Sequence, residues 1–204
     1  MLYQTAPAFL GQEEAEQLLA YALDNESRFC PATVGAETVD PKVRRASLLR
    51  DLGPHRSLVE SRALAWVPAL IRDLRLTPFE PTGVELELVA HQDGAFYQRH
   101  LDLFTGDVHG DHAPQDRLIS MVLYLNREPK PYQGGELRVY TGLDVANPPP
   151  DEYIDIEPHH RLAVAFSSWL IHEVRPVRCS SDRFEDARFA INCWILRDRG
   201  VRPD

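Results

Sequence analysis

The stretch Val84-Glu85-Leu86-Glu87-Leu88-Val89 alternates apolar and polar side chains, the pattern of a β-strand with one buried face. Further along the chain, short apolar runs rich in β-branched or aromatic residues are separated by turn-forming residues. We expect these runs to be strands as well. They cover residues 118–125, 137–140, 162–166 and 189–195.

Helices are expected before these strands. Gln12–Leu23 carries acidic residues in its first turn and apolar residues at helical spacing, and Ser57–Leu74 shows the same spacing. Pro68, inside the second segment, predicts a kink or an interruption. Helices followed by many short strands are typical of an α+β protein. We therefore predict a double-stranded β-helix, a jelly-roll or cupin-like barrel, with the N-terminal helices packed on one outer face.

The length, the net charge and the number of cysteines limit the classes of protein to which this chain can belong. The 204 residues fit one domain, and we expect helical support in residues 1–82 and the barrel in 83–198. A net charge of −9 repels phosphate backbones, so no nucleic-acid partner is expected. No apolar run is long enough to span a membrane, and the N-terminus lacks signal-peptide features. The three cysteines, odd in number and widely spaced, fit a reducing cytoplasm. Nothing in the sequence indicates an oligomeric state.

Three residues form a split metal-ligand pattern: His100 and Asp102, two positions apart, and a single distant His172. Residues i and i+2 of a strand point to the same face, so one metal can lie between the first two. A neighbouring strand can then bring His172 across from them. Two imidazoles and one carboxylate are the donor set of an Fe(II) site with open coordination positions.

Other residues indicate a second ligand beside this metal. Arg188 opens the apolar run 189–195, and a buried guanidinium needs an anionic partner, for which a dicarboxylate is suited. Tyr124 offers an apolar ring with one hydroxyl that can bond to the same carboxylate. Arg183 is a rival for this contact; we favour Arg188 because it leads directly into a strand, whereas Arg183 lies among polar residues.

Several spaced motifs together resemble the prolyl 4-hydroxylase-like branch of the Fe(II)- and 2-oxoglutarate-dependent dioxygenases. They run in family order through roughly the C-terminal half of the chain, whereas the N-terminal helices carry no specific match. The motifs are Phe96-Tyr97-Gln98-Arg99-His100-Leu101-Asp102, Val122-Leu123-Tyr124-Leu125-Asn126, Gly134-Gly135-Glu136-Leu137, His172-Glu173-Val174-Arg175-Pro176-Val177 and Arg188-Phe189-Ala190.

The resemblance implies a role for each matching residue. The metal ligands would be His100, Asp102 and His172. For 2-oxoglutarate, it implies that Arg188 pairs with the distal carboxylate, that Tyr124 hydrogen-bonds to it and that Leu137 packs against the co-substrate. Tyr97 would border the active site, and His91 lies near a position where some relatives have a tyrosine that contacts 2-oxoglutarate. One departure is the longer gap between His172 and Arg188, with residues 179–186 inserted.

The activity implied is an oxidoreductase that uses Fe(II), 2-oxoglutarate, O2 and, as a reductant, ascorbate to hydroxylate an unactivated C–H bond, releasing succinate and CO2. As the substrate, the resemblance implies a prolyl residue of a protein or peptide. The alternative is a free amino acid or small natural product, for which cyclisation or desaturation also remains open. A non-catalytic cupin-like metal- or ligand-binding protein is the alternative of another class. Substrate selection is expected from Arg44 and Arg45, residues 103–114 and residues 148–150, because loops at a barrel mouth select substrates.

Overall fold

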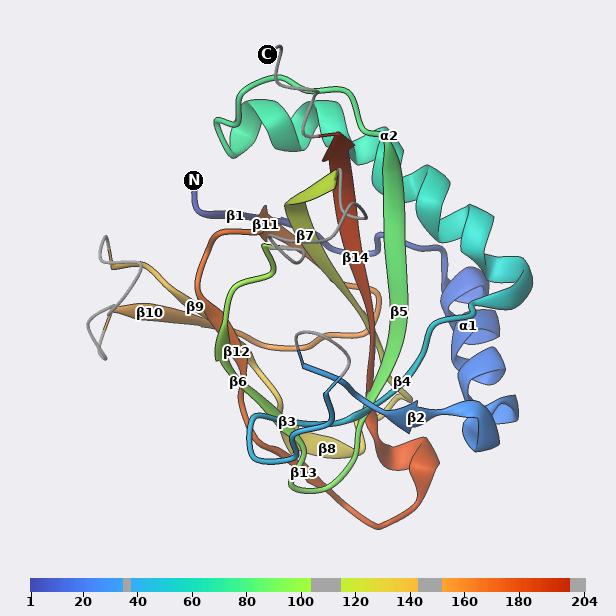
Figure 1. Ribbon diagram of the computed structural model, residues 1–204. Helices are drawn as coiled ribbons and strands as arrows, with labels where there is room; N and C mark the ends of the chain where they lie inside the picture. Colours follow the sequence, from blue (N-terminus) through green and yellow to red (C-terminus); the bar gives the residue numbers. More distant parts are fainter. Residues whose placement is uncertain (35–37, 104–114, 143–151, 199–204) are drawn as a thin grey trace.

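The computed structural model describes residues 1–34, 38–103, 115–142 and 152–198 (Figure 1). The larger of its two main sheets has the strand order β1-β11-β7-β14-β5-β4-β2, and every neighbouring pair is antiparallel. Its strands are β1 (Tyr3–Ala6), β2 (Cys30–Pro31), β4 (Ser47–Leu49), β5 (Gly83–His91), β7 (Gln115–Leu125), β11 (Ala163–Ser167) and β14 (Arg188–Asp198).

A smaller antiparallel sheet faces the larger one. Its order is β10-β9-β12-β6-β3, and the β9–β10 pair extends away from the barrel at the left of Figure 1. A further pair of strands, β8 with β13, lies beside these two sheets. The bounds are β3 (Arg44–Arg45), β6 (Phe96–His100), β8 (Tyr132–Gly134), β9 (Leu137–Tyr140), β10 (Tyr153–Ile156), β12 (His172–Val174) and β13 (Val177–Cys179).

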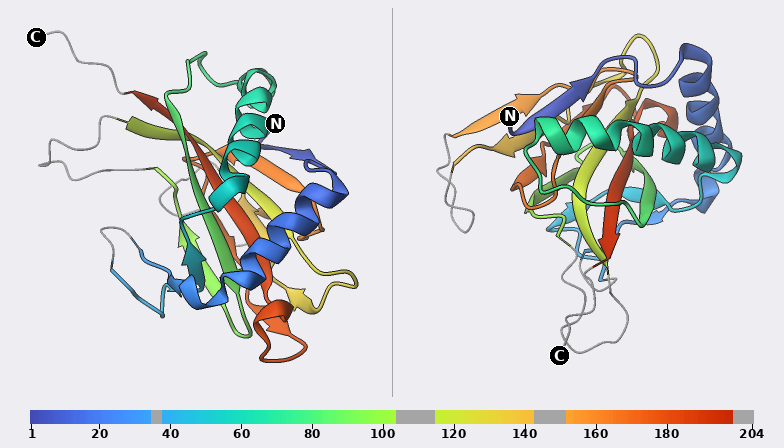
Figure 2. Two further views of the ribbon diagram at one scale, coloured as in Figure 1. Left: turned by 90° about the vertical axis from the view of Figure 1, so that its right-hand side faces the viewer. Right: turned by 90° about the horizontal axis from the view of Figure 1, so that it is seen from above.

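Both long helices cover the outer face of the larger sheet (Figure 2). They are α1 (Gln12–Asp24) and α2 (Arg56–Asp73); single turns of 3-10 helix span Glu26–Arg28, Gly53–His55 and Phe184–Asp186. The alternation in β5 explains this layering. Leu86 and Leu88 belong to the core shared with the helices, whereas Glu85 and Glu87 line a cavity on the opposite side of the strand.

A second, smaller core joins the two sheets. Val122, Val164 and Phe166 of the larger sheet pack with Leu137 and Val139 of the smaller sheet. Two facing antiparallel sheets with helices on one outer side confirm the predicted jelly-roll class. Among the described residues, no helix is both long enough and apolar enough to cross a membrane.

Two local expectations differ from the structure. Residues 1–82, expected to be helical, also supply strands β1 to β4, two of which extend the larger sheet on one side and one on the other. Helix α2 continues through Pro68 without interruption. Pro68 is exposed, so the backbone carbonyl that loses its helical partner there can bond to water.

Candidate metal centre and co-substrate pocket

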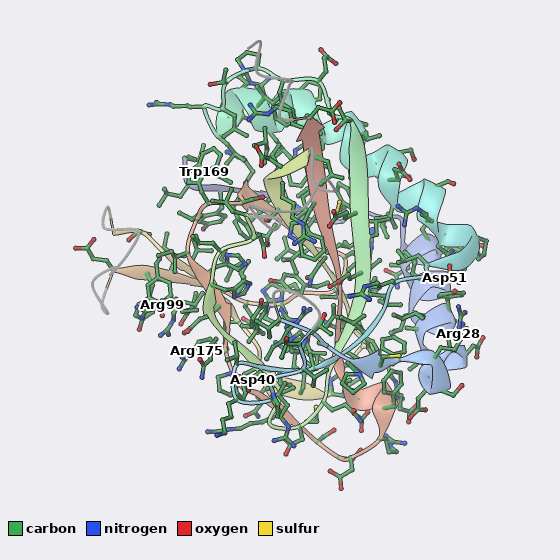
Figure 3. All side chains as sticks on the ribbon, in the orientation of Figure 1. Arg28, Asp40, Asp51, Arg99, Trp169 and Arg175 are labelled. Carbon is green, nitrogen blue, oxygen red and sulfur yellow. The ribbon has the colours of Figure 1, made fainter. Side chains whose placement is uncertain are left out.

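The predicted metal ligands come together between the two sheets. His100 ends β6, His172 begins β12, and the antiparallel register pairs the two residues directly. Arg99, the neighbour of His100, is directed outward (Figure 3), as the alternation of a strand requires when His100 faces the interior. One ligand atom each from His100, Asp102 and His172 lies within 4.8 Å of the others. This donor set can hold one Fe(II) ion with open positions.

Backbone carbonyls orient both imidazoles. Nδ1 of His100 lies 2.7 Å from the carbonyl oxygen of Gln98, and Nδ1 of His172 lies 2.8 Å from that of Leu170. A carbonyl only accepts, so these contacts assign the proton of each neutral ring to Nδ1. Nε2 of each ring then presents its lone pair toward Asp102, 3.5 Å from Oδ1 in His100 and 3.5 Å from Oδ2 in His172. Such contacts fix the tautomer and orientation of metal-binding histidines.

Asp102 lies two residues beyond the end of β6, whereas the sequence predicted it on the strand. The pairing of β6 with β12 ends at His100, and the backbone N–H of Asp102 donates instead to the carbonyl of Ser168 at 3.0 Å. The hydroxyl of Ser120 donates to Oδ2 of Asp102 at 2.7 Å and lies 2.9 Å from the hydroxyl of Ser168. The buried Ser120, which is itself in contact with the buried Ser168, therefore orients the carboxylate, a feature that the motif itself did not reveal.

The three ligands also shift one another's protonation. Burial raises the pKa of the Asp102 carboxyl, but His172 and His100 outweigh this effect and hold that pKa well below its ordinary value. Burial and the charge of His172 lower the pKa of His100. Burial lowers the pKa of His172 too, but Asp102 outweighs it, and the pKa lies above 6.5. A bound metal must therefore displace a proton mainly from His172, so metal affinity falls as the pH falls.

Ser120→Ala is expected to weaken metal binding about tenfold to hundredfold, the usual effect of removing a group that orients a ligand. The Asp102 carboxylate would lose its 2.7 Å hydrogen bond while all three ligands remain. Titration with Co(II), followed by its visible spectrum, measures the dissociation constant. Ser120→Thr, which keeps the hydroxyl, should restore the affinity; equal affinities of Ser120→Ala and the wild type would show that the serine does not orient Asp102.

A group of buried hydrogen-bond donors lies at the other side of the same cavity. Arg188 is 1% exposed, and its guanidinium carbon lies 4.9 Å above the ring of Tyr124. Nη1 of Arg188 is 3.4 Å from Nδ1 of His91, which is directly opposite in the β5–β14 register. Nη2 of Arg188, the hydroxyl of Tyr124 and Nε2 of His91 have no partner among the described residues. Buried donors without acceptors are unfavourable, and a carboxylate would satisfy them.

The Gly134-Gly135 turn is what allows Arg188 to reach this position. The carbonyl of Gly135 accepts a hydrogen bond from Nε of Arg188 at 2.8 Å. Gly135 has φ +71°, and a Cβ there would meet Cδ of Arg188 at 2.5 Å. Only glycine combines this backbone conformation with so close an approach. The turn therefore fixes the orientation of the guanidinium toward the cavity.

The remaining predicted site residues also have definite places. Leu137 and Tyr97 line the cavity, and the ring of Tyr97 stacks on that of His100 with centroids 3.5 Å apart. Arg183, the rival of Arg188, lies at the surface with its side chain 64% exposed, where it pairs with Glu185 and Asp186. Of the expected substrate-selecting segments, residues 104–114 and 148–150 lie outside the described residues.

A comparison with known families places the chain in a superfamily. Residues 86–196, more than half of the chain, match the 2OG-Fe(II) oxygenase superfamily, where 2OG stands for 2-oxoglutarate. The chain belongs to this superfamily. The predicted resemblance to the Fe(II)- and 2-oxoglutarate-dependent dioxygenases is thereby confirmed, and membership of this superfamily implies Fe(II), 2-oxoglutarate and O2. The residues that the structure brings together fit these groups: a His-Asp-His cluster for the metal and buried donors for a carboxylate.

Three relatives illustrate the similarity. An uncharacterized PKHD-type hydroxylase of Synechocystis is 30% identical over 193 residues, which are 93% of this chain and 61% of that protein. The chain thus spans about three fifths of the length of this curated relative. A prolyl-4-hydroxylase of Pseudomonas putida has a TM-score of 0.71 at 24% identity, covering 96% of this chain and 93% of the other. A prolyl hydroxylase of Trichoplax adhaerens, solved with a hypoxia inducible factor peptide, has a TM-score of 0.67 at 20% identity, with coverages of 96% and 84%.

Proposed function

We propose that this oxygenase hydroxylates an unactivated C–H bond of its substrate, with 2-oxoglutarate converted to succinate and CO2. The observation that carries the proposal is the shared cavity of about 810 Å³, which His100, Asp102, His172, His91 and Arg188 all line. A group of metal-ligating side chains and a set of unsatisfied donors for a carboxylate therefore line the same cavity. A reaction between metal, co-substrate and substrate requires this proximity.

His100, Asp102 and His172 would hold the metal. Bound Fe(II) supplies the activation of O2, which protein side chains cannot perform. The protein contributes a fixed set of three ligands: the carbonyls of Gln98 and Leu170 hold the imidazoles, and Ser120 holds the carboxylate. Because Asp102 fills the carboxylate position, hydroxylation is the expected outcome of the reaction.

Arg188, Tyr124 and His91 would bind the distal carboxylate of 2-oxoglutarate. Arg188 presents Nη2 and Tyr124 presents its hydroxyl, both buried and without partners among the described residues. A guanidinium only donates, so its contact with Nδ1 of His91 assigns the proton of that ring to Nε2. Nε2 of His91 then becomes a third donor. Leu137 would pack against the carbon chain of the co-substrate, and Tyr97 would border the substrate.

The role of His91 predicts a pH profile. Burial, and then the charge of Arg188, lowers the pKa of His91 well below 6.5, so the ring stays neutral at higher pH. Between about pH 6.5 and 8.5 the ionisation of His91 should therefore not change the affinity for 2-oxoglutarate. At a pH well below that range, protonation of Nδ1 of His91 removes the acceptor for Arg188 and weakens the binding of 2-oxoglutarate.

Isothermal titration with 2-oxoglutarate at several pH values tests this role of His91. In His91→Leu the loss of affinity at acid pH should disappear, while the affinity itself falls about tenfold. An acid-side loss that persists unchanged in His91→Leu would refute the role.

The substrate that we favour is a prolyl residue of a protein or peptide. Support comes from the fold shared with the two prolyl hydroxylases, one of which was solved with a peptide bound. A free amino acid or small natural product is the second candidate, supported by the many charged side chains that line the cavity. We further infer that residues 1–82 support the barrel of residues 83–198 as one catalytic domain.

The experiment that tests the function is release of succinate from 2-oxoglutarate with Fe(II) and ascorbate, in the presence of host-cell extract separated by size. Stimulation by the macromolecular fraction, with a mass increase of one oxygen on a prolyl residue, supports a protein hydroxylase. Stimulation by the small-molecule fraction supports a metabolic enzyme. Binding of metal without any succinate formation, in every fraction, would favour a non-catalytic binding protein.

A further inference from the structure

Part of the cavity lining is strongly charged. Along the register of β5 and β14, Arg188 lies opposite His91, whereas Asn192 lies opposite Glu87 and Trp194 opposite Glu85. Around these last pairs the lining carries more positive than negative groups, although the whole chain has a net charge of −9. The residues of this charged part are Arg44, Arg50, Arg56, Arg117, Glu85 and Glu87.

Arg44 is the most deeply buried of these cations. It lies on β3 with 8% of its surface exposed and lines the cavity, whereas its neighbour Arg45 is exposed. Nη1 of Arg44 donates to the carbonyl of Thr33 at 3.1 Å, and Nη2 lies 3.4 Å from the carboxylate of Glu87. Nε of Arg44 has no acceptor among the described residues. A buried N–H of a charged group without an acceptor is costly unless a ligand supplies one.

The charge of Arg44 is only partly neutralised. Glu87 is shared, because its other oxygen lies 3.7 Å from Nε of Arg50. One carboxylate thus faces two guanidinium groups. Arg117, by contrast, pairs with Glu85, and its guanidinium carbon lies 3.9 Å above the ring of Trp194. The unsatisfied donor and the excess positive charge therefore coincide at Arg44, and a carboxylate from outside the protein would satisfy both.

Arg44 is also close to the metal ligands. Its guanidinium carbon lies 4.8 Å from the centroid of the Tyr97 ring, and that ring stacks on His100 at 3.5 Å. The Tyr97 ring therefore contacts both the guanidinium of Arg44 and a ligand of the proposed metal. A substrate whose carboxylate is bound by Arg44 would therefore present to the metal a C–H bond that is a few bonds away from that carboxylate.

We propose that Arg44 binds a carboxylate of the substrate, so that the enzyme acts on acidic molecules: free amino acids, or peptides with an acidic side chain or a free carboxyl terminus. This inference rests on the proposed hydroxylase function and specifies its substrate class. Glu87 lowers the affinity of this site for the substrate, because its carboxylate competes with the substrate carboxylate for the guanidinium of Arg44.

The test compares matched probes that differ in their carboxylate, with succinate release as the readout. One arm uses the common L-amino acids and their carboxamides. The other arm uses three libraries of N-acetylated dipeptides: carboxamides lacking Asp and Glu, the same peptides as free acids, and carboxamides that include Asp and Glu. We expect at least one carboxylate-bearing set to stimulate turnover about tenfold to hundredfold more than its carboxylate-free counterpart. The arm that responds identifies the source of the carboxylate.

Two variants then tie the preference to Arg44. In Arg44→Gln the ratio of kcat/KM for acid over amide should fall to about one, because the neutral amide cannot pair with a carboxylate. In Glu87→Gln the ratio should rise, since the competing carboxylate is gone, a change that a purely structural role of Arg44 would not produce. Arg28→Gln is the matched surface control: Arg28 pairs with Asp51 at the outside of the molecule (Figure 3), and turnover should stay unchanged.

The visible charge-transfer absorption on anaerobic addition of Fe(II) and 2-oxoglutarate separates this proposal from the function on which it rests. With that absorption present, equal stimulation by each carboxylate-bearing set and its carboxylate-free counterpart overturns the carboxylate site, as does a lack of stimulation by every carboxylate-bearing set. An acid preference that survives in Arg44→Gln overturns it as well. If the absorption is missing in the wild type, the proposed function fails first.

Discussion

Asp102→Ala is expected to abolish 2-oxoglutarate turnover. The substitution removes the anionic ligand that the structure places between Nε2 of His100 and Nε2 of His172. Removing an outer group such as Ser120 is expected to weaken metal binding about tenfold to hundredfold, so loss of a ligand itself should exceed about a hundredfold. Succinate release under saturating 2-oxoglutarate measures the effect.

The matched control for this prediction is Asp51→Ala. Asp51 is a surface carboxylate, with its side chain 59% exposed, on the opposite side of the molecule from Arg99 in Figure 3. Its removal should leave turnover unchanged. Unchanged consumption of 2-oxoglutarate in Asp102→Ala would contradict the assignment of the metal site.

Arg188→Met is expected to raise the KM for 2-oxoglutarate by at least about thirtyfold. Truncating one partner of a buried, hydrogen-bonded charge pair costs about 2–5 kcal/mol. The variant removes the fully buried guanidinium whose Nη2 is available to the carboxylate. Tyr124→Phe removes only one hydroxyl, so its effect should be smaller, about tenfold. Initial rates over a series of 2-oxoglutarate concentrations measure both.

The surface residue Arg183 provides the comparison for Arg188. Because Arg183 pairs with Glu185 and Asp186 and is 64% exposed, Arg183→Met should leave the KM unchanged. The reverse result, a raised KM in Arg183→Met and a normal one in Arg188→Met, would make Arg183 the carboxylate ligand. Circular dichroism of each variant shows whether the loss of a buried charge has disturbed the fold.

The fold was predictable because its signals are periodic. The alternation of apolar and polar side chains in residues 84–89 predicts a strand with one apolar and one polar face. The structure packs Leu86 into the core shared with the helices and places Glu87 in the cavity lining. The strands of residues 3–6, 30–31 and 47–49 were not predicted. These segments are two to four residues long, too short for a periodic pattern, and their pairing depends on distant strands.

Those residues of the candidate site that belong to a sequence motif were predictable. Residues that reach the site from distant segments of the chain were harder to predict. The sequence favoured Arg188 over Arg183 because Arg188 leads directly into a strand, but only the structure shows that Arg188 is buried and Arg183 is exposed. Ser120 was missed for a similar reason, because a serine in an apolar strand gives no sign that it faces Asp102. Arg44 and Arg45 were grouped together, and only the strand places one inside and the other outside.

The central claim is that the His-Asp-His cluster and the buried donors bind iron and 2-oxoglutarate in one cavity. The most direct measurement is anaerobic addition of Fe(II) and then 2-oxoglutarate to the purified protein, recorded as a visible absorption spectrum. We predict a metal-to-ligand charge-transfer band in the wild type, its loss in Asp102→Ala, and a need for more 2-oxoglutarate in Arg188→Met. A colourless wild-type protein, or a band of undiminished strength in Asp102→Ala, would contradict the account.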